Sequence, residues 1–127
     1  MIVHTVIESP TFLADCLKAG VSEEDRGMMV SAISNDPKKG DVMPGTGGAR
    51  KLRFAGRGKG KSGGYRTVHF YAAADVPALM LALIDKGERA DLSQAERNEL
   101  RKELSGYAAD YRASVKTKVS VRKRGKT

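Results

Sequence analysis

The chain has 127 residues, which is enough for one domain whose hydrophobic core needs no disulfide bonds. Apolar residues make up 40% of it and charged residues 30%, a composition typical of a soluble globular protein. Its single cysteine excludes an internal disulfide and a cysteine-rich metal site, and no segment resembles a signal peptide or a membrane span. We therefore expect a cytoplasmic protein that does not enter a membrane.

The net charge of +8 is concentrated in two segments. Residues 50–66 hold seven cations and residues 113–127 hold six, and neither segment contains a carboxylate. The rest of the chain has ten basic and fifteen acidic residues, so it is acidic on balance. Basicity this local indicates a partner rich in phosphate or carboxylate groups.

The N-terminal third predicts one strand followed by two helices. Ile2–Glu8 is rich in β-branched residues and predicts a strand, and Thr11–Ala19 predicts a helix in which the lone Cys16 packs. Ser22 is placed to cap a second helix, because three acidic residues follow it in the first turn. Residues 38–48 have no clear period and predict a connector.

A basic hairpin comes next. In residues 51–54, apolar and cationic side chains alternate, which puts Leu52 and Phe54 on one face of a strand and Lys51 and Arg53 on the other. A glycine-rich basic loop over residues 56–64 then leads to a second strand. The simpler interpretation is an edge hairpin kept soluble by its lysines, but cations without carboxylates and a flexible loop favour an anion or nucleic-acid site.

The C-terminal half contains an apolar run, a helix and a tail. Val76–Ile84 suits a strand or a buried helix segment, and we predict a central strand. Ser93 and Glu96 form a capping box that begins a charged helix, which we expect to end near Tyr111. From Ala113 onward the sequence suits a loose strand or a disordered tail, and a solvated tail is favoured over one that docks onto a partner.

The sequence gives little support for a nucleotide-binding site or a metal site. Residues 55–62 approach a phosphate-binding P-loop, but two glycines and a strand follow where that motif needs a helix. His4 and His69 are isolated and no carboxylates have ligand spacing, so no metal site is predicted. An enzyme of this sequence would work without a cofactor, through lysine, arginine, tyrosine or backbone amides.

Three blocks in order, residues 44–54, 56–66 and 85–100, resemble the RelE/ParE toxin superfamily, and most of all the HigB-type branch of RelE toxins. The resemblance implies an α+β, RelE-like fold: a small, mostly antiparallel twisted sheet with two N-terminal helices on one face and a C-terminal helix. On this basis we expect a toxin domain over residues 1–112 and a basic tail over residues 113–127.

The resemblance implies a toxin of a type II toxin–antitoxin system that inhibits translation by cleaving messenger RNA on the ribosome without a metal. Its expected partners are the ribosome, messenger RNA and a cognate antitoxin with a helix-turn-helix domain. Operator DNA is contacted only through that antitoxin, and the complex represses its own operon.

The family's basic catalytic residues correspond to Lys51, Arg53 and Arg66, and a further cation corresponds to Lys86. In this chemistry a ribose 2′-OH attacks the adjacent phosphate, and fixed cations stabilise the charge that builds on its oxygens. Arg53 and Arg66 would hold phosphate oxygens, and Lys51 would act as a base. Expected RNA contacts come from the surrounding residues Arg50, Arg57, Lys59, Lys61 and Tyr65, the last by stacking on a base.

Two alternatives use the same residues. One is a basic RNA-binding or ribosome-binding module that catalyses nothing, and the other is a ParE-like inhibitor of DNA gyrase. RelE itself has a catalytic tyrosine near the position of Leu92 or Ser93, so the resemblance leaves the general acid unassigned.

Overall fold

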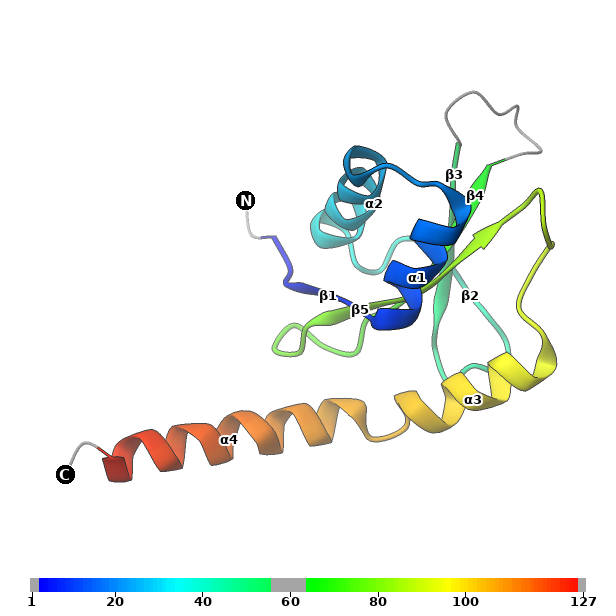
Figure 1. Ribbon diagram of the computed structural model, residues 1–127. Helices are drawn as coiled ribbons and strands as arrows, with labels where there is room; N and C mark the ends of the chain where they lie inside the picture. The colour runs from blue at the N-terminus through cyan, green and yellow to red at the C-terminus, as the bar shows by residue number, and fades with distance from the viewer. Residues whose placement is uncertain (1–2, 56–63, 126–127) are drawn as a thin grey trace.

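The computed structural model describes residues 3–55 and 64–125, with residues 118–125 described as backbone only. Figure 1 shows a twisted sheet with helices around it, which confirms the predicted α+β class. In chain order the elements are β1 (Val6–Glu8), α1 (Pro10–Ala19), α2 (Glu23–Asn35), β2 (Asp41–Val42), β3 (Arg50–Phe54), β4 (Tyr65–Phe70), β5 (Ala78–Asp85), α3 (Gln94–Leu104) and α4 (Tyr107–Gly125).

Within the described residues, five strands form one sheet in the order β1-β5-β4-β3-β2. β1 runs parallel to β5, and each of the other neighbouring pairs is antiparallel. β5 therefore has a strand on each side, and an interior strand covered on both faces is expected to be apolar throughout. The predicted strand over Val76–Ile84 is confirmed, with bounds Ala78–Asp85.

Serine side chains begin both N-terminal helices. Ser9 and Ser22 each accept a hydrogen bond from a backbone N–H of the first turn, as predicted for Ser22. Pro10 occupies the first helical position, where its missing N–H costs no hydrogen bond, so α1 begins one residue before the predicted Thr11. Gly20 ends α1 in the left-handed conformation, at a φ of 74°.

The first strand is shorter than the predicted Ile2–Glu8. Only Val6–Glu8 pair with β5. Just upstream, the His4 N–H donates to the Ser34 carbonyl at 2.8 Å and the Ser34 hydroxyl donates to the His4 carbonyl at 2.6 Å. These bonds tie the segment to the end of α2 instead of extending the strand.

α1 and α2 cover one face of the sheet, as the resemblance implies (Figure 1). The predicted packing of Cys16 is confirmed, because it is only 2% exposed. Burial raises the pKa of its thiol to about 11, so the thiol stays protonated at neutral pH. The buried side chains of this first core are Phe12, Cys16, Met29, Ile33, Tyr65, Ala78, Met80 and Leu83.

The opposite face carries a second core beneath α3. The capping box that begins α3 is present as predicted: Ser93 accepts from the Glu96 N–H, and the Glu96 carboxylate accepts from the Ser93 N–H. α3 contributes Leu104, and the residues that lead into it contribute Leu92. The other buried members are Met43, Ala49, Val68, Leu81, Ala82 and Ile84.

An extra residue in β5 lets one strand serve both cores. Consecutive residues of β4 pair with Ala82 and Met80, so Leu81 forms a β-bulge. Before the bulge Met80 packs in the first core, and after it Leu83 does, while Leu81 and Ala82 both pack in the second. The bulge shifts the alternation of the strand by one residue.

The C-terminal helix differs from the prediction. The single helix expected from Ser93 to Tyr111 is broken at Ser105, which is extended, and at Gly106, which has a φ of 86°. α4 then continues to Gly125, where a loose strand or disorder is expected from sequence. The alternating valines suggest a strand, yet the segment contains many good helix formers and no proline.

The start of the expected tail, Ala113, thus lies inside α4, and the division of the chain at residue 112 stays a prediction. In the part of the chain that the structure describes, no helix combines the length and hydropathy needed to cross a membrane.

Candidate functional site

Two arginines form a cross-strand pair at one end of the sheet. Arg53 of β3 lies directly opposite Arg66 of β4, and both are on the face away from α1 and α2. Like charges in such a pair repel each other at a Cβ separation of about 5 Å. Among the described residues, no carboxylate is paired with either guanidinium. An anion bound between the two arginines would relieve this repulsion.

Local geometry brings these strands close together. The predicted alternation of β3 is confirmed, because Leu52 and Phe54 pack against the first core. Gly64 precedes β4, and a Cβ there would lie 2.5 Å from the Phe54 carbonyl oxygen. Only glycine permits this approach, so Gly64 helps to set the Arg53–Arg66 pairing.

Lys51 belongs to the same face and joins a second charged cluster. Its Nζ lies 3.5 Å from Oδ2 of Asp91, and a guanidinium nitrogen of Arg97 lies 3.1 Å from the same oxygen. Burial tends to raise the pKa of Asp91, but the Leu92 N–H and the charges of Lys51 and Arg97 together lower it below its usual range. Asp91 is therefore an ionised anchor between two cations.

Asp91 and Arg97 are absent from the sequence-based prediction. Asp91 is 40 residues from Lys51 along the chain, and their contact depends on the path from β5 to α3. No local pattern in the sequence indicates this contact.

Lys86 lies at the same end of the sheet as Arg66. Its backbone N–H donates to the Gly64 carbonyl at 3.1 Å, just before β4 begins. Its Nζ lies 3.5 Å from the Ala90 carbonyl oxygen, next to Asp91 in sequence. The structure thus brings the four predicted catalytic cations to one region: a cross-strand pair, a neighbour on β3, and a lysine at the end of β5.

A family model described as the RelE toxin of the RelE/RelB toxin–antitoxin system matches residues 18–125. The chain belongs to the RelE toxin family. The match confirms the resemblance to this superfamily, and it extends past residue 112 into α4. As a RelE-family toxin of a toxin–antitoxin system, the protein has an antitoxin as its partner.

Two residues that were expected to contact RNA lie on the opposite face of this toxin. Arg50 is in phase with Leu52, and its guanidinium donates to the Gly40 carbonyl at 3.1 Å. Tyr65 pairs with Phe54 across the sheet and is 6% exposed in the first core. Strand alternation therefore separates Arg50 and Tyr65 from Arg53, and the buried ring of Tyr65 does not fit the predicted stacking on a base.

The remaining predicted RNA contacts, Arg57, Lys59 and Lys61, lie outside the described residues, as does most of the P-loop-like segment. Within the described residues, no group of three or more histidine, cysteine or acidic side chains could hold a metal ion.

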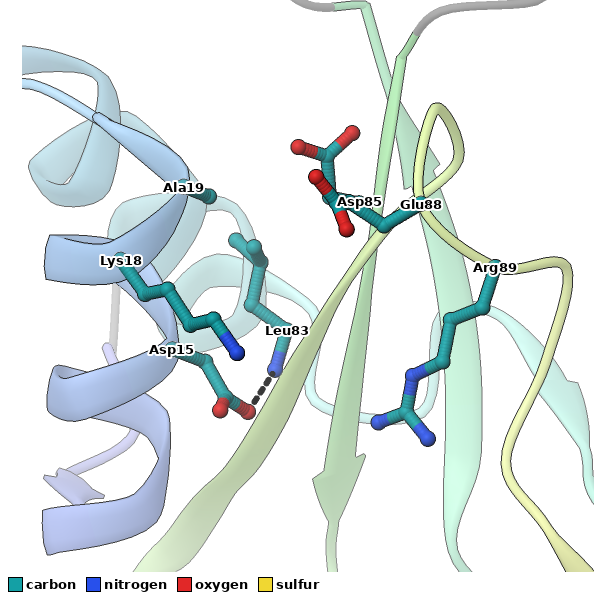
Figure 2. Close-up of a pocket in the computed structure, with 7 residues that line it drawn as sticks. All are labelled: Asp15, Lys18, Ala19, Leu83, Asp85, Glu88 and Arg89. Carbon is teal, nitrogen blue, oxygen red and sulfur yellow. Dashed lines mark hydrogen bonds between the residues drawn. The ribbon is translucent and has the colours of Figure 1, made fainter.

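A pocket of about 320 Å³ lies between α1 and the turn that follows β5 (Figure 2). Asp15 of α1 lines this pocket, and its carboxylate accepts a hydrogen bond from the Leu83 N–H of β5 at 3.0 Å. The charged residues around it are Asp15, Lys18, Asp85, Glu88 and Arg89. With three carboxylates and two cations, this pocket does not suit a phosphate, and it shares no residue with the Arg53–Arg66 pair.

Proposed function

We propose that this RelE-family toxin is a HigB-type endoribonuclease that cleaves messenger RNA on the ribosome without a metal ion. The observation that supports this proposal most is the cross-strand pair of Arg53 and Arg66, with Lys51 on the same face. Toxins of the family are generally endoribonucleases, which agrees with this assignment.

The proposed reaction uses these cations in sequence. The ribose 2′-oxygen attacks the adjacent phosphorus and loses its proton, and the bond from phosphorus to the 5′-oxygen breaks as that oxygen gains a proton. The products are a 2′,3′-cyclic phosphate and a free 5′-hydroxyl. Negative charge builds on the non-bridging oxygens, where two guanidinium groups stabilise it more than they stabilise the substrate. Lys51 is the candidate for proton transfer, and Asp91 positions it at 3.5 Å.

Arg66 is the most informative residue to replace. We expect Arg66→Ala to reduce the cleavage rate on ribosomes by about 10²–10³-fold, the usual effect of removing one group that stabilises an oxyanion. Arg66→Lys should recover only part of this loss, because an ammonium group cannot match two phosphate oxygens at once. The measurement is single-turnover cleavage of a translated message by purified toxin.

Lys102→Ala is the matched control, because this exposed lysine of α3 lies outside the cluster. Unchanged cleavage by Arg66→Ala would contradict the proposed site. The wild-type toxin, expressed without an antitoxin, should also create new 5′ ends in messages, and only where ribosomes translate them. Growth arrest with intact messages would instead indicate a gyrase inhibitor or a ribosome-blocking module.

We further propose that the antitoxin carries a helix-turn-helix domain and that the complex represses its own operon. In a gel-shift assay, the toxin with its antitoxin should then bind operator DNA, and the toxin alone should not. Operator binding by the toxin alone would contradict this part of the proposal.

A further inference from the structure

The second basic segment of the chain forms a helix that leaves the rest of the molecule. α4 is attached near its start: the Tyr107 hydroxyl donates to the Pro77 carbonyl at 2.9 Å, and Arg112 makes two 2.7 Å bonds to Asp75. In Figure 1 the helix then runs away from the sheet, on the side opposite the C-terminal end of β3. Residues 113–117 are all exposed. Five exposed residues exceed one helical turn, so no side of α4 is buried against the domain there, and even Val115 is 41% exposed.

This free part of α4 carries a strong charge of one sign. Residues 113–127 contain no carboxylate, and the nearest one upstream is Asp110. A lone helix of this length is marginally stable in water, and like charges four residues apart, such as Lys118 and Arg122, weaken it further. A partner that supplies negative charge would stabilise it. The cations of this part of α4 are Lys116, Lys118, Arg122, Lys123 and Arg124.

The order of residues favours a polyphosphate over a lipid surface. A helix that lies on a membrane needs a continuous apolar face. On α4, Val115 and Val119 are neighbours at a spacing of four, but Lys116, Arg122 and Lys123 are the other helical neighbours of Val119. A basic segment without a continuous apolar stripe suits the closely spaced phosphates of a nucleic-acid duplex.

We propose that α4 beyond Arg112 is a helical arm that binds the phosphate backbone of double-helical ribosomal RNA. The choice of ribosomal RNA rests on the proposed function, which places the toxin on the ribosome. Because the arm is remote from Arg53 and Arg66, it contributes affinity for the ribosome and takes no part in the cleavage step.

The test compares two triple variants of the full-length toxin with equal net charge. The arm variant carries Lys116→Gln, Arg122→Gln and Lys123→Gln. The control variant carries Lys18→Gln, Lys39→Gln and Lys102→Gln, three exposed lysines elsewhere on the domain. Binding to a short RNA duplex and to purified ribosomes is measured by fluorescence anisotropy or sedimentation over a range of salt concentrations.

We expect the arm variant to bind more weakly than wild type. The slope of log K against log salt concentration should become shallower by about two to three, since each phosphate contact contributes roughly 0.9. The control variant should bind like wild type. At saturating ribosome concentration, the arm variant should cleave messages at the wild-type rate.

Equal loss of binding in both variants would overturn the proposal, because only net charge would then matter. Arm-dependent binding to anionic lipid vesicles, with no arm-dependent binding to RNA, would also overturn it. The duplex assay contains no cleavage step. A toxin that failed to cut messages would therefore contradict the proposed function. The comparison of RNA-duplex binding between the arm variant and the control variant would still test the arm.

Discussion

Arg53 and Arg66 show how a site can be prepared at the level of single residues. Two guanidinium groups held across a strand pair repel each other in the free protein, and a bound phosphate would relieve this repulsion. In contrast, Lys51 and Arg97 have Asp91 between them. In the part of the chain that the structure describes, the toxin thus has one pair of cations without a carboxylate partner and, beside it, a cluster in which one carboxylate holds two cations.

His69 is a buried polar residue that gives the fold a dependence on pH. Its side chain is fully buried, and its Nε2 lies 3.1 Å from the Pro37 carbonyl oxygen. Burial disfavours the charged imidazolium and lowers the pKa of His69, although the bond to Pro37 opposes the shift. In the native toxin this imidazole is therefore neutral at pH values where it is already charged in the unfolded chain.

From this shift we predict that the free energy of unfolding falls as the pH decreases through about 6.5. Below that pH the unfolded chain takes up a proton that native His69 resists, so protons favour unfolding until the native pKa is also passed. Urea unfolding at pH 7.5 and 5.5 measures the effect, and His69→Gln should reduce it. The carboxylate of Glu96, with a pKa of about 2, acts only in more acidic solution. An equal pH dependence in both proteins would contradict the prediction.

At the scale of elements, α3 is defined mainly by its first turn. Most of its surface is exposed, and Leu104 is its one buried residue in the described structure. The capping box at Ser93 and Glu96 satisfies two backbone N–H groups there. A bidentate pair between Glu96 and Arg89 ties the same turn to the loop after β5.

We predict that Ser93→Ala lowers the free energy of unfolding by about 1 kcal/mol, within the range of roughly 0.5–2 kcal/mol for lost N-caps. Ser105→Ala at the other end of α3 is the control, because its side chain has no hydrogen bond in the described structure. Chemical denaturation followed by circular dichroism gives both values. A cost for Ser105→Ala as large as that for Ser93→Ala would contradict the role of the cap.

Local chemistry explains which elements the sequence predicts correctly. The caps at Ser22 and Ser93 and the alternation of Lys51 to Phe54 depend on residues within three or four positions, so a single segment contains the information. The helical form of α4 is not predicted from the sequence, because its alternating valines favour a strand and its run of charge favours disorder.

The site was predicted in part for the same reason. The sequence identified the cations of β3 and β4, but it grouped them by charge, whereas the sheet separates them by face. Arg50 and Tyr65 follow the phase of Leu52 and Phe54 and lie against the other core. Asp91 could not be found locally, because its contact with Lys51 forms only when α3 folds onto the sheet.

At the scale of the whole molecule, the toxin combines a body that is acidic on balance with two separate basic regions. One region lies at the end of the sheet where β3 and β4 meet, and the other is the free part of α4. Regions of like charge placed apart can engage a large polyanion at two points, so their binding energies reinforce each other on one particle.

The central place of β5 also affects when the toxin can become active during its own synthesis. β1 and β4 both pair with β5, and the two cores both need its side chains. A growing chain therefore cannot complete its sheet until residues 78–85 have been translated and released from the ribosome. Nascent chains stalled before Ala78 should be degraded readily by protease, and chains that expose all residues through Leu104 should resist it. Translation thus includes an interval in which the emerging toxin domain is still unfolded.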